Sequence, residues 1–143
     1  MTYGFTKTDK FAFTMIEILV VITIIALLAG AGLAQFSYLS KSSRDARRKA
    51  DIENIRGGLE LYRSNNGGSY PSSLTFNCPP SGALADTSNT YLSPIPNDPK
   101  CLSGGTNKYT YSVSAPYQTY SLWVPLESGA VGATYAASPY GSQ

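Results

Sequence analysis

The chain has 143 residues, a net charge of +2 and no histidine. This length suffices for one compact domain beside a membrane helix but excludes a large core. The absence of histidine removes the commonest general base, the commonest metal ligand and the usual serine or cysteine triads, so the composition argues against an enzyme. The small net charge identifies no partner.

The most apolar part of the chain is residues 11–40, which contain no lysine or arginine and a single acid, Glu17. A run of this kind is long enough to cross the roughly 30 Å core of a bilayer as a helix. A carboxylate at the centre of a membrane span costs on the order of 2.5–3.5 kcal/mol, so Glu17 is a candidate functional residue. The plainer alternative is a carboxylate that extends to the lipid headgroups.

A short polar leader with two lysines precedes residues 12–17, AFTMIE. This arrangement resembles the processing site of type IV pilins and type II secretion pseudopilins. The resemblance implies that a prepilin peptidase cuts between Ala12 and Phe13 and that the new amino group of Phe13 is methylated. It also implies that Glu17 neutralises the terminal amine of a neighbouring subunit inside a filament, since a buried charge is tolerable when it is paired. The family nearly always has glycine at the position of Ala12.

Two patterns oppose this interpretation. An ordinary secretory signal could end near Gly30 or Gly32, although such signals have apolar regions of only about 7–15 residues and would leave Glu17 unexplained. The basic residues that follow the span would also keep that flank in the cytoplasm by the positive-inside tendency. We give precedence to the resemblance, which places the leader inside and the basic segment outside.

The helical pattern continues through residues 37–63, where apolar side chains recur at spacings of three, four and three: Ile52, Ile55, Leu59 and Tyr62. Gly57 and Gly58 weaken the predicted helix, and the NNGG run at residues 65–68 predicts its end. Residues 59–71, LELYRSNNGGSYP, resemble a second pilin and pseudopilin signature. The sequence therefore predicts one long helix whose second half packs on a small sheet.

A basic cluster lies on this second half of the helix, and it consists of Arg44, Arg47, Arg48 and Lys49. The plainer interpretation is a solvated helical face or salt bridges between subunits. The sharper hypothesis is contact with DNA phosphates or anionic headgroups, which needs a basic patch but no particular sequence.

Residues 66–107 are rich in Ser, Pro, Gly and Asn, which predicts mostly loop, with one helical turn near residues 83–86. Cys78 and Cys101 have 22 residues between them. In an oxidising compartment the expectation is a disulfide that contributes about 3 kcal/mol, and the alternative is two separate thiols. Neither cysteine belongs to a CxxC pair, so zinc binding and redox catalysis are poor interpretations.

Two alternating runs near the end of the chain predict a hairpin with a turn at residues 115–118. Its core-facing residues are Tyr109, Tyr111, Val113, Tyr120, Leu122 and Val124. Trp123 points away from Leu122 and either contacts another subunit or packs beneath the tail. Asp98 and Glu127 are too few for calcium, which takes about six to eight oxygens, so we expect no metal and no cofactor.

The predicted fold class is α+β, a long N-terminal helix packed against a small antiparallel sheet in the manner of pilins. The predicted organisation is a leader (1–12), a transmembrane or filament-core helix (13–36), the soluble half of the helix (37–65), a variable loop (66–107), a β-hairpin (108–127) and a Gly/Ala/Ser-rich tail (128–143). The tail adds an edge strand or hangs loose.

The resemblance implies a structural subunit that begins as a single-pass inner-membrane protein and then polymerises into a helical, cell-surface or extracellular filament. Its implied partners are further copies of the chain, the prepilin peptidase, an assembly ATPase and a platform protein. The alternatives are a pseudopilin of a type II secretion-like system and a minor pilin that binds DNA during uptake. An anchored hydrolase lacks any nucleophile-and-base constellation.

Overall fold

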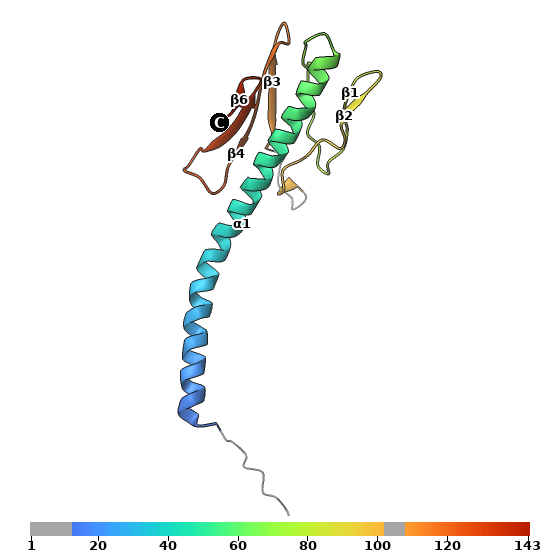
Figure 1. Cartoon of the computed structure of the whole chain (residues 1–143). Coiled ribbons are helices and arrows are strands. Elements are labelled where there is room, and N and C mark those ends of the chain that lie inside the picture. Colours follow the sequence, from blue (N-terminus) through green and yellow to red (C-terminus); the bar gives the residue numbers. More distant parts are fainter. Residues whose placement is uncertain (1–12, 102–107) are drawn as a thin grey trace, which may run out of the picture. The chain divides into compact units, whose positions relative to one another are not determined.

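The computed structural model describes residues 13–101 and 108–143, and for residues 31–34 it describes the backbone without side chains. It contains one long helix, α1 (Met15–Asn65), and six strands (Figure 1). The strands are β1 (Leu84–Ala85), β2 (Thr90–Leu92), β3 (Thr110–Ser114), β4 (Thr119–Pro125), β5 (Thr134–Ser138) and β6 (Gly141–Ser142). This is the predicted α+β arrangement. The chain divides into two compact units, Met1–Ser37 and Tyr38–Gln143, and we call the second unit the head.

The core of the head lies between α1 and the sheet β3-β4-β5-β6, which is antiparallel throughout. From the helix, Ile52, Ile55 and Leu59 are fully buried, as their helical spacing predicts. From β4, Leu122 and Val124 are fully buried, while Ser121 and Trp123, which alternate with them, are exposed. A strand places alternate side chains on opposite faces, so one face of the sheet covers the apolar stripe of the helix.

The predicted hairpin is present, because β3 pairs with β4 in a register that places Tyr111 opposite Leu122. Residues 115–118 form the turn between the two strands. Trp123 lies on the opposite face of β4 from Leu122 and is 38% exposed. The C-terminal segment does not hang loose, because it forms β5 and β6 and extends the sheet beyond β4.

The predicted helical turn at residues 83–86 is wrong, because the structure has strand β1 there, paired with β2. Leu84 of β1 is buried, and its Cδ2 atom lies 3.3 Å from where a Cβ atom on Gly58 would stand. Leu92 of β2 approaches the same point at 3.2 Å through its Cβ atom. The glycine in the helix therefore lets this second sheet pack closely against α1, and the helix continues through it.

The end of α1 follows the predicted turn chemistry. Gly67 and Gly68 both have positive φ angles, of 63° and 83°. The backbone N–H of Gly68 donates to the carbonyl of Arg63 at 3.0 Å, which is the long bond of a Schellman motif. The side chain of Asn66 also donates to the carbonyl of Tyr62 at 2.9 Å. These bonds satisfy carbonyls that have no partner within the helix.

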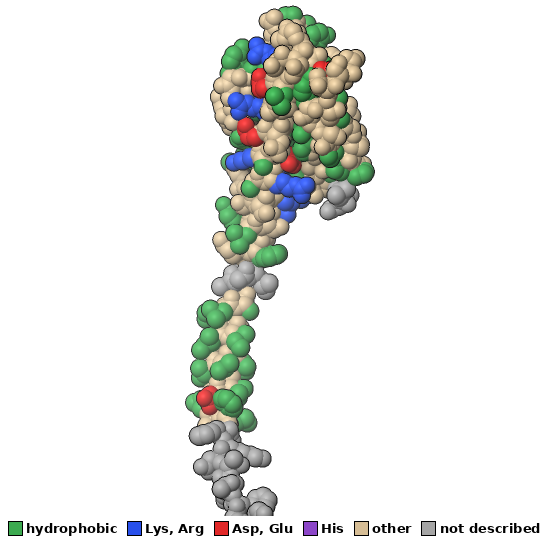
Figure 2. All heavy atoms as spheres, turned by 45° about the vertical axis from the view of Figure 1, so that its right-hand side comes forward, with side chains coloured by type: hydrophobic (Ala, Val, Ile, Leu, Met, Phe, Trp, Pro, Cys, Tyr) green, Lys and Arg blue, Asp and Glu red, His purple; other side chains and the backbone are tan. Residues whose placement is uncertain are grey.

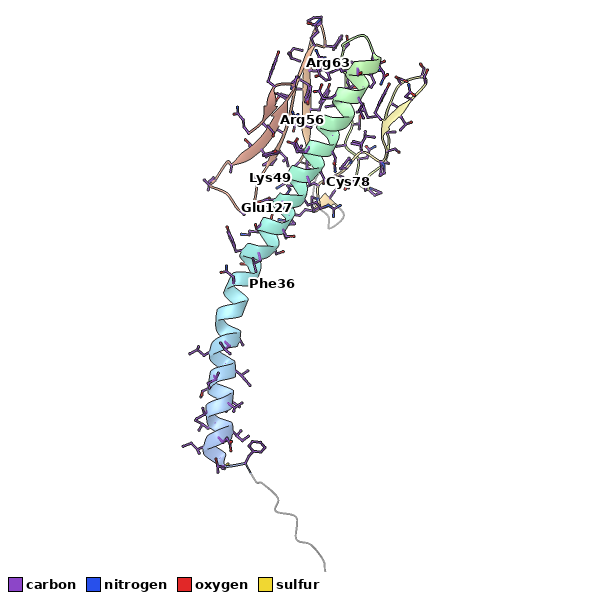
Figure 3. The ribbon with its side chains drawn as sticks, viewed as in Figure 1. Phe36, Lys49, Arg56, Arg63, Cys78 and Glu127 are labelled. Atoms are coloured by element: carbon purple, nitrogen blue, oxygen red, sulfur yellow. A yellow bond between two sulfur atoms is a disulfide. The ribbon has the colours of Figure 1, made fainter. Side chains whose placement is uncertain are left out.

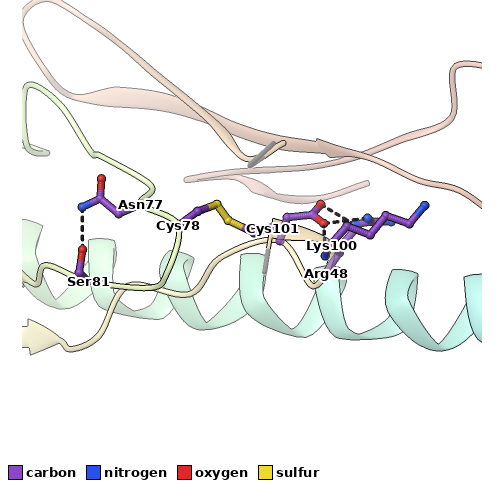
Figure 4. The surroundings of a disulfide bond; sticks show 7 residues. Arg48, Asn77, Cys78, Ser81, Lys100 and Cys101 are labelled. Carbon is purple, nitrogen blue, oxygen red and sulfur yellow. Dashed lines mark hydrogen bonds and ion pairs between the residues drawn. A yellow bond between two sulfur atoms is a disulfide. The ribbon is translucent and has the colours of Figure 1, made fainter. Parts of the chain in front are cut away.

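A disulfide joins Cys78 to Cys101 (Figure 4). Cys101 is buried, and its backbone N–H donates to the carbonyl of Asp98 at 2.9 Å. The disulfide therefore ties the start of the connection between helix and sheet to the short loop that carries Asp98.

Candidate functional site

The first candidate site is the exposed segment of α1 that follows the leader. Every residue from Phe13 to Gly30 is exposed. Twelve of these are large and hydrophobic: Phe13, Met15, Ile16, Ile18, Leu19, Val20, Val21, Ile22, Ile24, Ile25, Leu27 and Leu28. Hydrophobic side chains cover the visible side of this segment (Figure 2). A helix that is apolar on all sides is typical of a membrane span or of the centre of a larger assembly.

By its length and composition, α1 could cross a membrane. An 18-residue window of α1 reaches a mean hydropathy of 2.6. Thr23, a polar residue inside this stretch, donates its hydroxyl to the carbonyl of Val20 at 2.8 Å. Such a bond within the helix removes most of the cost of placing a hydroxyl in an apolar environment.

Thr14 and Glu17 define the start of the helix. The backbone N–H of Glu17 donates to the Oγ1 atom of Thr14 at 3.3 Å and to its carbonyl at 3.1 Å. Thr14 is thus the N-cap, and Glu17 occupies the third helical position, as in a capping box. A negative charge in the first turn also interacts favourably with the helix dipole. Among the described residues, the carboxylate of Glu17 has no hydrogen-bond or ion-pair partner.

The four residues of the predicted basic patch do not share one surface. The side chain of Arg48 is completely buried, whereas that of Arg47 is 64% exposed. Arg44 forms an ion pair with Glu127 at 2.6 Å. Lys49 is exposed, and its Nζ atom lies 5.5 Å from the centroid of the Tyr135 ring. A continuous patch that could contact DNA through all four residues is therefore not formed.

Arg48 instead stands at the centre of an ion network inside the head. Its Nε and Nη2 atoms donate to the two oxygens of Asp98 at 2.8 and 3.0 Å. Its Nη1 atom donates to Asp45 at 2.8 Å, and Nη2 also donates to Glu127 at 2.6 Å. Figure 4 shows Arg48 beside the loop that carries Lys100 and Cys101. A buried charge with this many good hydrogen bonds fixes the elements that provide them.

The remaining bonds close the network. Glu127 also pairs with Lys100 at 2.8 Å, and Figure 3 shows Glu127 beside α1. Asp45 accepts hydrogen bonds from the backbone N–H groups of Glu127 and Ser128 and from the Ser128 hydroxyl, at 2.7–3.0 Å. Three cations and three carboxylates thus connect α1, the loop before β3 and the loop after β4.

The network lowers the pKa of two of its carboxyl groups. Hydrogen bonding from Arg44, followed by bonds from Lys100 and Arg48, lowers the pKa of Glu127 well below its ordinary value, although partial burial opposes this. Burial would raise the pKa of Asp45, but hydrogen bonds from Ser128 and the Glu127 backbone outweigh it and lower that pKa. Both carboxyl groups are therefore held in their charged form.

Two further carboxylates of α1 accept hydrogen bonds from tyrosine hydroxyls of the head. The hydroxyl of Tyr135 donates to Glu53 at 2.8 Å, and the hydroxyl of Tyr70 donates to Glu60 at 2.9 Å. Burial and the bond to Glu60 raise the pKa of Tyr70 to about 12. Basic and acidic side chains lie next to one another on the visible face of the head (Figure 2). Glu53 and Glu60 of α1 are thus engaged in contacts within the head.

The sequence prediction missed the role of Arg48, Asp98 and Glu127 as one network, although a signal was present. Arg48 lies four residues before Ile52 and therefore continues the stripe that places Ile55 and Leu59 in the core. A cation on a core stripe predicts a buried partner, because an unpaired buried charge is very costly. Within the described residues, no group of three or more His, Cys, Asp or Glu side chains could hold a metal ion.

Comparison with known proteins identifies the N-terminal segment. Residues 7–33 match the family model described as the prokaryotic N-terminal methylation motif. This motif is the class III signal peptide of type IV pilins and pseudopilins. No curated protein and no solved structure matches the chain.

The matched motif contains the exposed segment and its capped first turn, and it supports a structural subunit of the pilin or pseudopilin kind. It implies processing by prepilin peptidase. Together with the long apolar helix, the motif indicates insertion into a membrane. The predicted cleavage between Ala12 and Phe13 involves a residue outside the described part of the chain.

Proposed function

We propose that this chain is a pilin that polymerises through residues 13–36 into a type IV pilus-like filament outside the cell. The observation that carries the proposal is the apolar surface of α1 from Met15 to Leu28, which is exposed on all sides of the helix and lies within the methylation motif. Exposed hydrophobic surface of this extent marks a site of membrane or protein interaction. In this proposal the surface lies in lipid before assembly and against the same segment of other copies afterwards.

Polar contacts have to direct this assembly, because lipid chains are as apolar as the helix itself. Moving the segment from the bilayer into a filament core therefore gains little hydrophobic free energy. The free energy of a carboxylate does differ between the bilayer and the filament core. It is high when the charge is unpaired in lipid and lower when the charge is paired in the filament. Glu17 is the acid of this segment and has no partner among the described residues. We infer that it pairs with the amino group of Phe13 from a neighbouring subunit.

This pairing requires cleavage of the leader, because Phe13 acquires a free amino group only when the bond to Ala12 is cut. Phe13 immediately precedes the N-cap residue Thr14 and is 76% exposed. Its amino group would thus stand at the start of the helix, where another subunit can reach it. Repeated contacts between the start of one helix and the first turn of the next do not close on themselves, so they generate a filament.

The proposal assigns a role to each part of the chain. Residues 1–12 are removed by a prepilin peptidase, residues 13–36 form the filament core, and the rest of α1 supports the head. The proposed partners are further copies of this chain, an assembly ATPase and a platform protein. The ion network around Arg48 serves to hold the loops of the head on α1.

Two measurements test the proposal in cells that carry a pilus assembly system. Mass spectrometry of the N-terminal peptide should show a chain that begins at Phe13 and carries one added methyl group. Glu17→Ala should reduce the amount of filament sheared from the cell surface at least tenfold, while the cellular amount of the protein remains the same. Thr23→Val is the matched control, because its hydroxyl bonds within the helix, and it should assemble normally.

Other outcomes would contradict the proposal. A chain that begins at Met1 or near Gly32 would indicate an ordinary anchor or secretory signal. Normal filaments from Glu17→Ala would show that the carboxylate does not direct assembly. A correctly processed protein that remains in the cell envelope would favour the pseudopilin of a secretion system.

A further inference from the structure

The outward face of the four-stranded sheet has an unusual composition. Ten residues of β3, β4 and β5 lie on this face by strand alternation and register: Thr110, Ser112, Ser114, Thr119, Ser121, Trp123, Pro125, Thr134, Ala136 and Ser138. We call it the hydroxyl face, because seven of these side chains are Ser or Thr and none is charged. The opposite face packs on α1, so only the hydroxyl face is open.

Trp123 occupies the centre of this face. It lies opposite Thr110 on β3 and opposite Ala136 on β5. The backbone of Ala136 exchanges two hydrogen bonds with Gln143, at 2.8 and 3.0 Å, so Gln143 stands next in the same row. The row therefore runs from a tryptophan across a small alanine to an amide side chain.

A depression of about 220 Å³ is lined by Ser121, Ala136, Ala137, Ser138, Gly141 and Gln143. Of these residues, Ala136 is the register partner of Trp123 on the neighbouring strand. The depression exists because Ala136 and Gly141 have little or no side chain between their larger neighbours. Drug-sized ligands occupy pockets of about 300–1,000 Å³, so this depression is suited to one ring of a larger molecule.

The polar groups around the depression retain free hydrogen-bonding capacity. The hydroxyl of Ser138 donates to the carbonyl of Gly141 at 3.2 Å and accepts from the N–H of Tyr140 at 3.3 Å. A hydroxyl has two acceptor lone pairs, so one remains. Ser121 and the amide of Gln143 have no side-chain partner among the described residues, and both can donate and accept.

We propose that the hydroxyl face binds a neutral saccharide, with one sugar ring against Trp123 and its hydroxyl groups bonded to Ser121, Ser138 and Gln143. A pyranose ring has an apolar C–H face and a rim of hydroxyl groups. The large apolar surface of tryptophan can pack against the C–H face of the sugar, and uncharged donors and acceptors can form hydrogen bonds with its hydroxyl groups. A nucleic acid or an anionic headgroup would require basic side chains, which this face lacks.

The same composition disfavours a second copy of the chain as the occupant. The cores of protein interfaces are enriched in aromatic and other apolar side chains. Trp123 is the one aromatic side chain among the ten residues of the hydroxyl face, and Pro125 and Ala136 are its only other apolar members. The inference concerns only the head and is independent of the proposed assembly through residues 13–36.

Intrinsic fluorescence provides a direct test, because Trp123 is the only tryptophan in the chain. The full-length protein is held in a detergent without a sugar headgroup and titrated with cellobiose, maltose, lactose and chitobiose. We expect a saturable change in the emission of Trp123 with at least one of these neutral disaccharides. Equilibrium dialysis with the radiolabelled sugar then measures the affinity of variants that lack the tryptophan.

Four variants test the assignment of the site. Trp123→Ala should weaken binding at least tenfold, whereas Trp123→Phe retains a flat apolar ring and should lose less. Ala136→Leu should abolish binding, because it fills the depression. Ser114→Ala lies on the same face outside the depression and should bind like the wild type. All these positions face outward, and unchanged circular dichroism and melting show that each variant is folded.

Several results would overturn the inference. The first is the absence of any response to the four sugars at 10 mM, which is about tenfold above a weak Kd of roughly 1 mM. The second is unchanged binding by folded Ala136→Leu. Binding of sulfated or carboxylated sugars alone would also contradict it. A shift of the Trp123 emission with protein concentration, in the absence of sugar, would show instead that copies of the chain cover this face.

Discussion

Arg48 and Asp98 form a completely buried ion pair in which two guanidinium nitrogens donate to the two carboxylate oxygens, at 2.8 and 3.0 Å. This planar, two-bond geometry is available to arginine but not to lysine. The two residues are 50 positions apart in the sequence. Their pairing therefore holds the loop that carries Asp98 on α1, next to the disulfide.

The first prediction concerns this pair. Arg48→Met should destabilise the head by about 3–5 kcal/mol, because it leaves the buried carboxylate of Asp98 without its counterion. Asp98→Asn should cost less, because Arg48 keeps its ion pairs with Asp45 and Glu127. Chemical denaturation followed by tyrosine fluorescence and circular dichroism measures the change. Arg47→Met is the matched control, since Arg47 is largely exposed and lies 3.9 Å from Asp51. An exposed pair contributes about 0–1 kcal/mol, so equal effects of the two arginine variants would contradict the network.

The second prediction is that the contribution of Glu127 to stability disappears in acid. Its pKa is lowered in the folded head, chiefly by Arg44, and is about 4.3 when unfolded. The stabilisation is thus fully present above that unfolded value and is lost as the pH falls toward the folded pKa. Glu127→Gln should be less stable than the wild type at pH 7, and the difference should shrink between about pH 5 and pH 2. A constant difference across this range would show that the charge of Glu127 is not responsible.

The third prediction concerns Asp51, whose pKa is raised in the folded head, whereas that of Glu127 is lowered. Burial raises its pKa, and the hydrogen bond from Tyr109 opposes this only in part. A carboxyl group with a raised folded pKa loses stabilisation as the pH rises above its unfolded value, which is about 3.9. Asp51→Asn should therefore gain stability relative to the wild type as the pH rises from about 3 to 7. A gain toward low pH would contradict the assignment.

The fourth prediction links the disulfide to the buried ion pair. Replacing both Cys78 and Cys101 by serine should reduce the free energy of unfolding by about 3 kcal/mol, because the bond closes a loop of 23 positions. The same loop positions Asp98 through the bond from the Cys101 N–H. Asp98→Asn should consequently cost less in the serine background than in the wild type. A double-mutant cycle measures this coupling, and strictly additive effects would argue against it.

The sequence predicted those parts of the fold that depend on a regular pattern. The stripe from Ile52 to Leu59 has a helical period, and the residues around Tyr111 and Leu122 alternate with a period of two. Each pattern is repeated over several residues, so it reports which face is buried. The helix and the hairpin were predictable for this reason.

The remaining features depend on contacts between distant segments. Strand β1 has two residues and exists because Leu84 packs against Leu92 and the helix at Gly58, which no local pattern encodes. The sequence places Arg48 in a run with Arg47 and Lys49, which are exposed, so the run hides that Arg48 also belongs to the core stripe. Asp98 and Glu127 are 29 positions apart, and no local pattern shows that both carboxylates bind the guanidinium of Arg48.

The last prediction compares two adjacent glycines of α1. A Cβ atom on Gly57 would meet no atom within 4 Å, whereas a Cβ atom on Gly58 would lie 3.2 Å from Leu92 and 3.3 Å from Leu84. Glycine in a helix costs about 0.8–1.0 kcal/mol relative to alanine, so Gly57→Ala should stabilise the head by nearly that amount. In Gly58→Ala the same gain is opposed by the displacement of β1 and β2, and we expect no stabilisation. Thermal unfolding of both variants provides the comparison. Equal stabilisation would mean that β1 and β2 are not held against the helix as the structure shows.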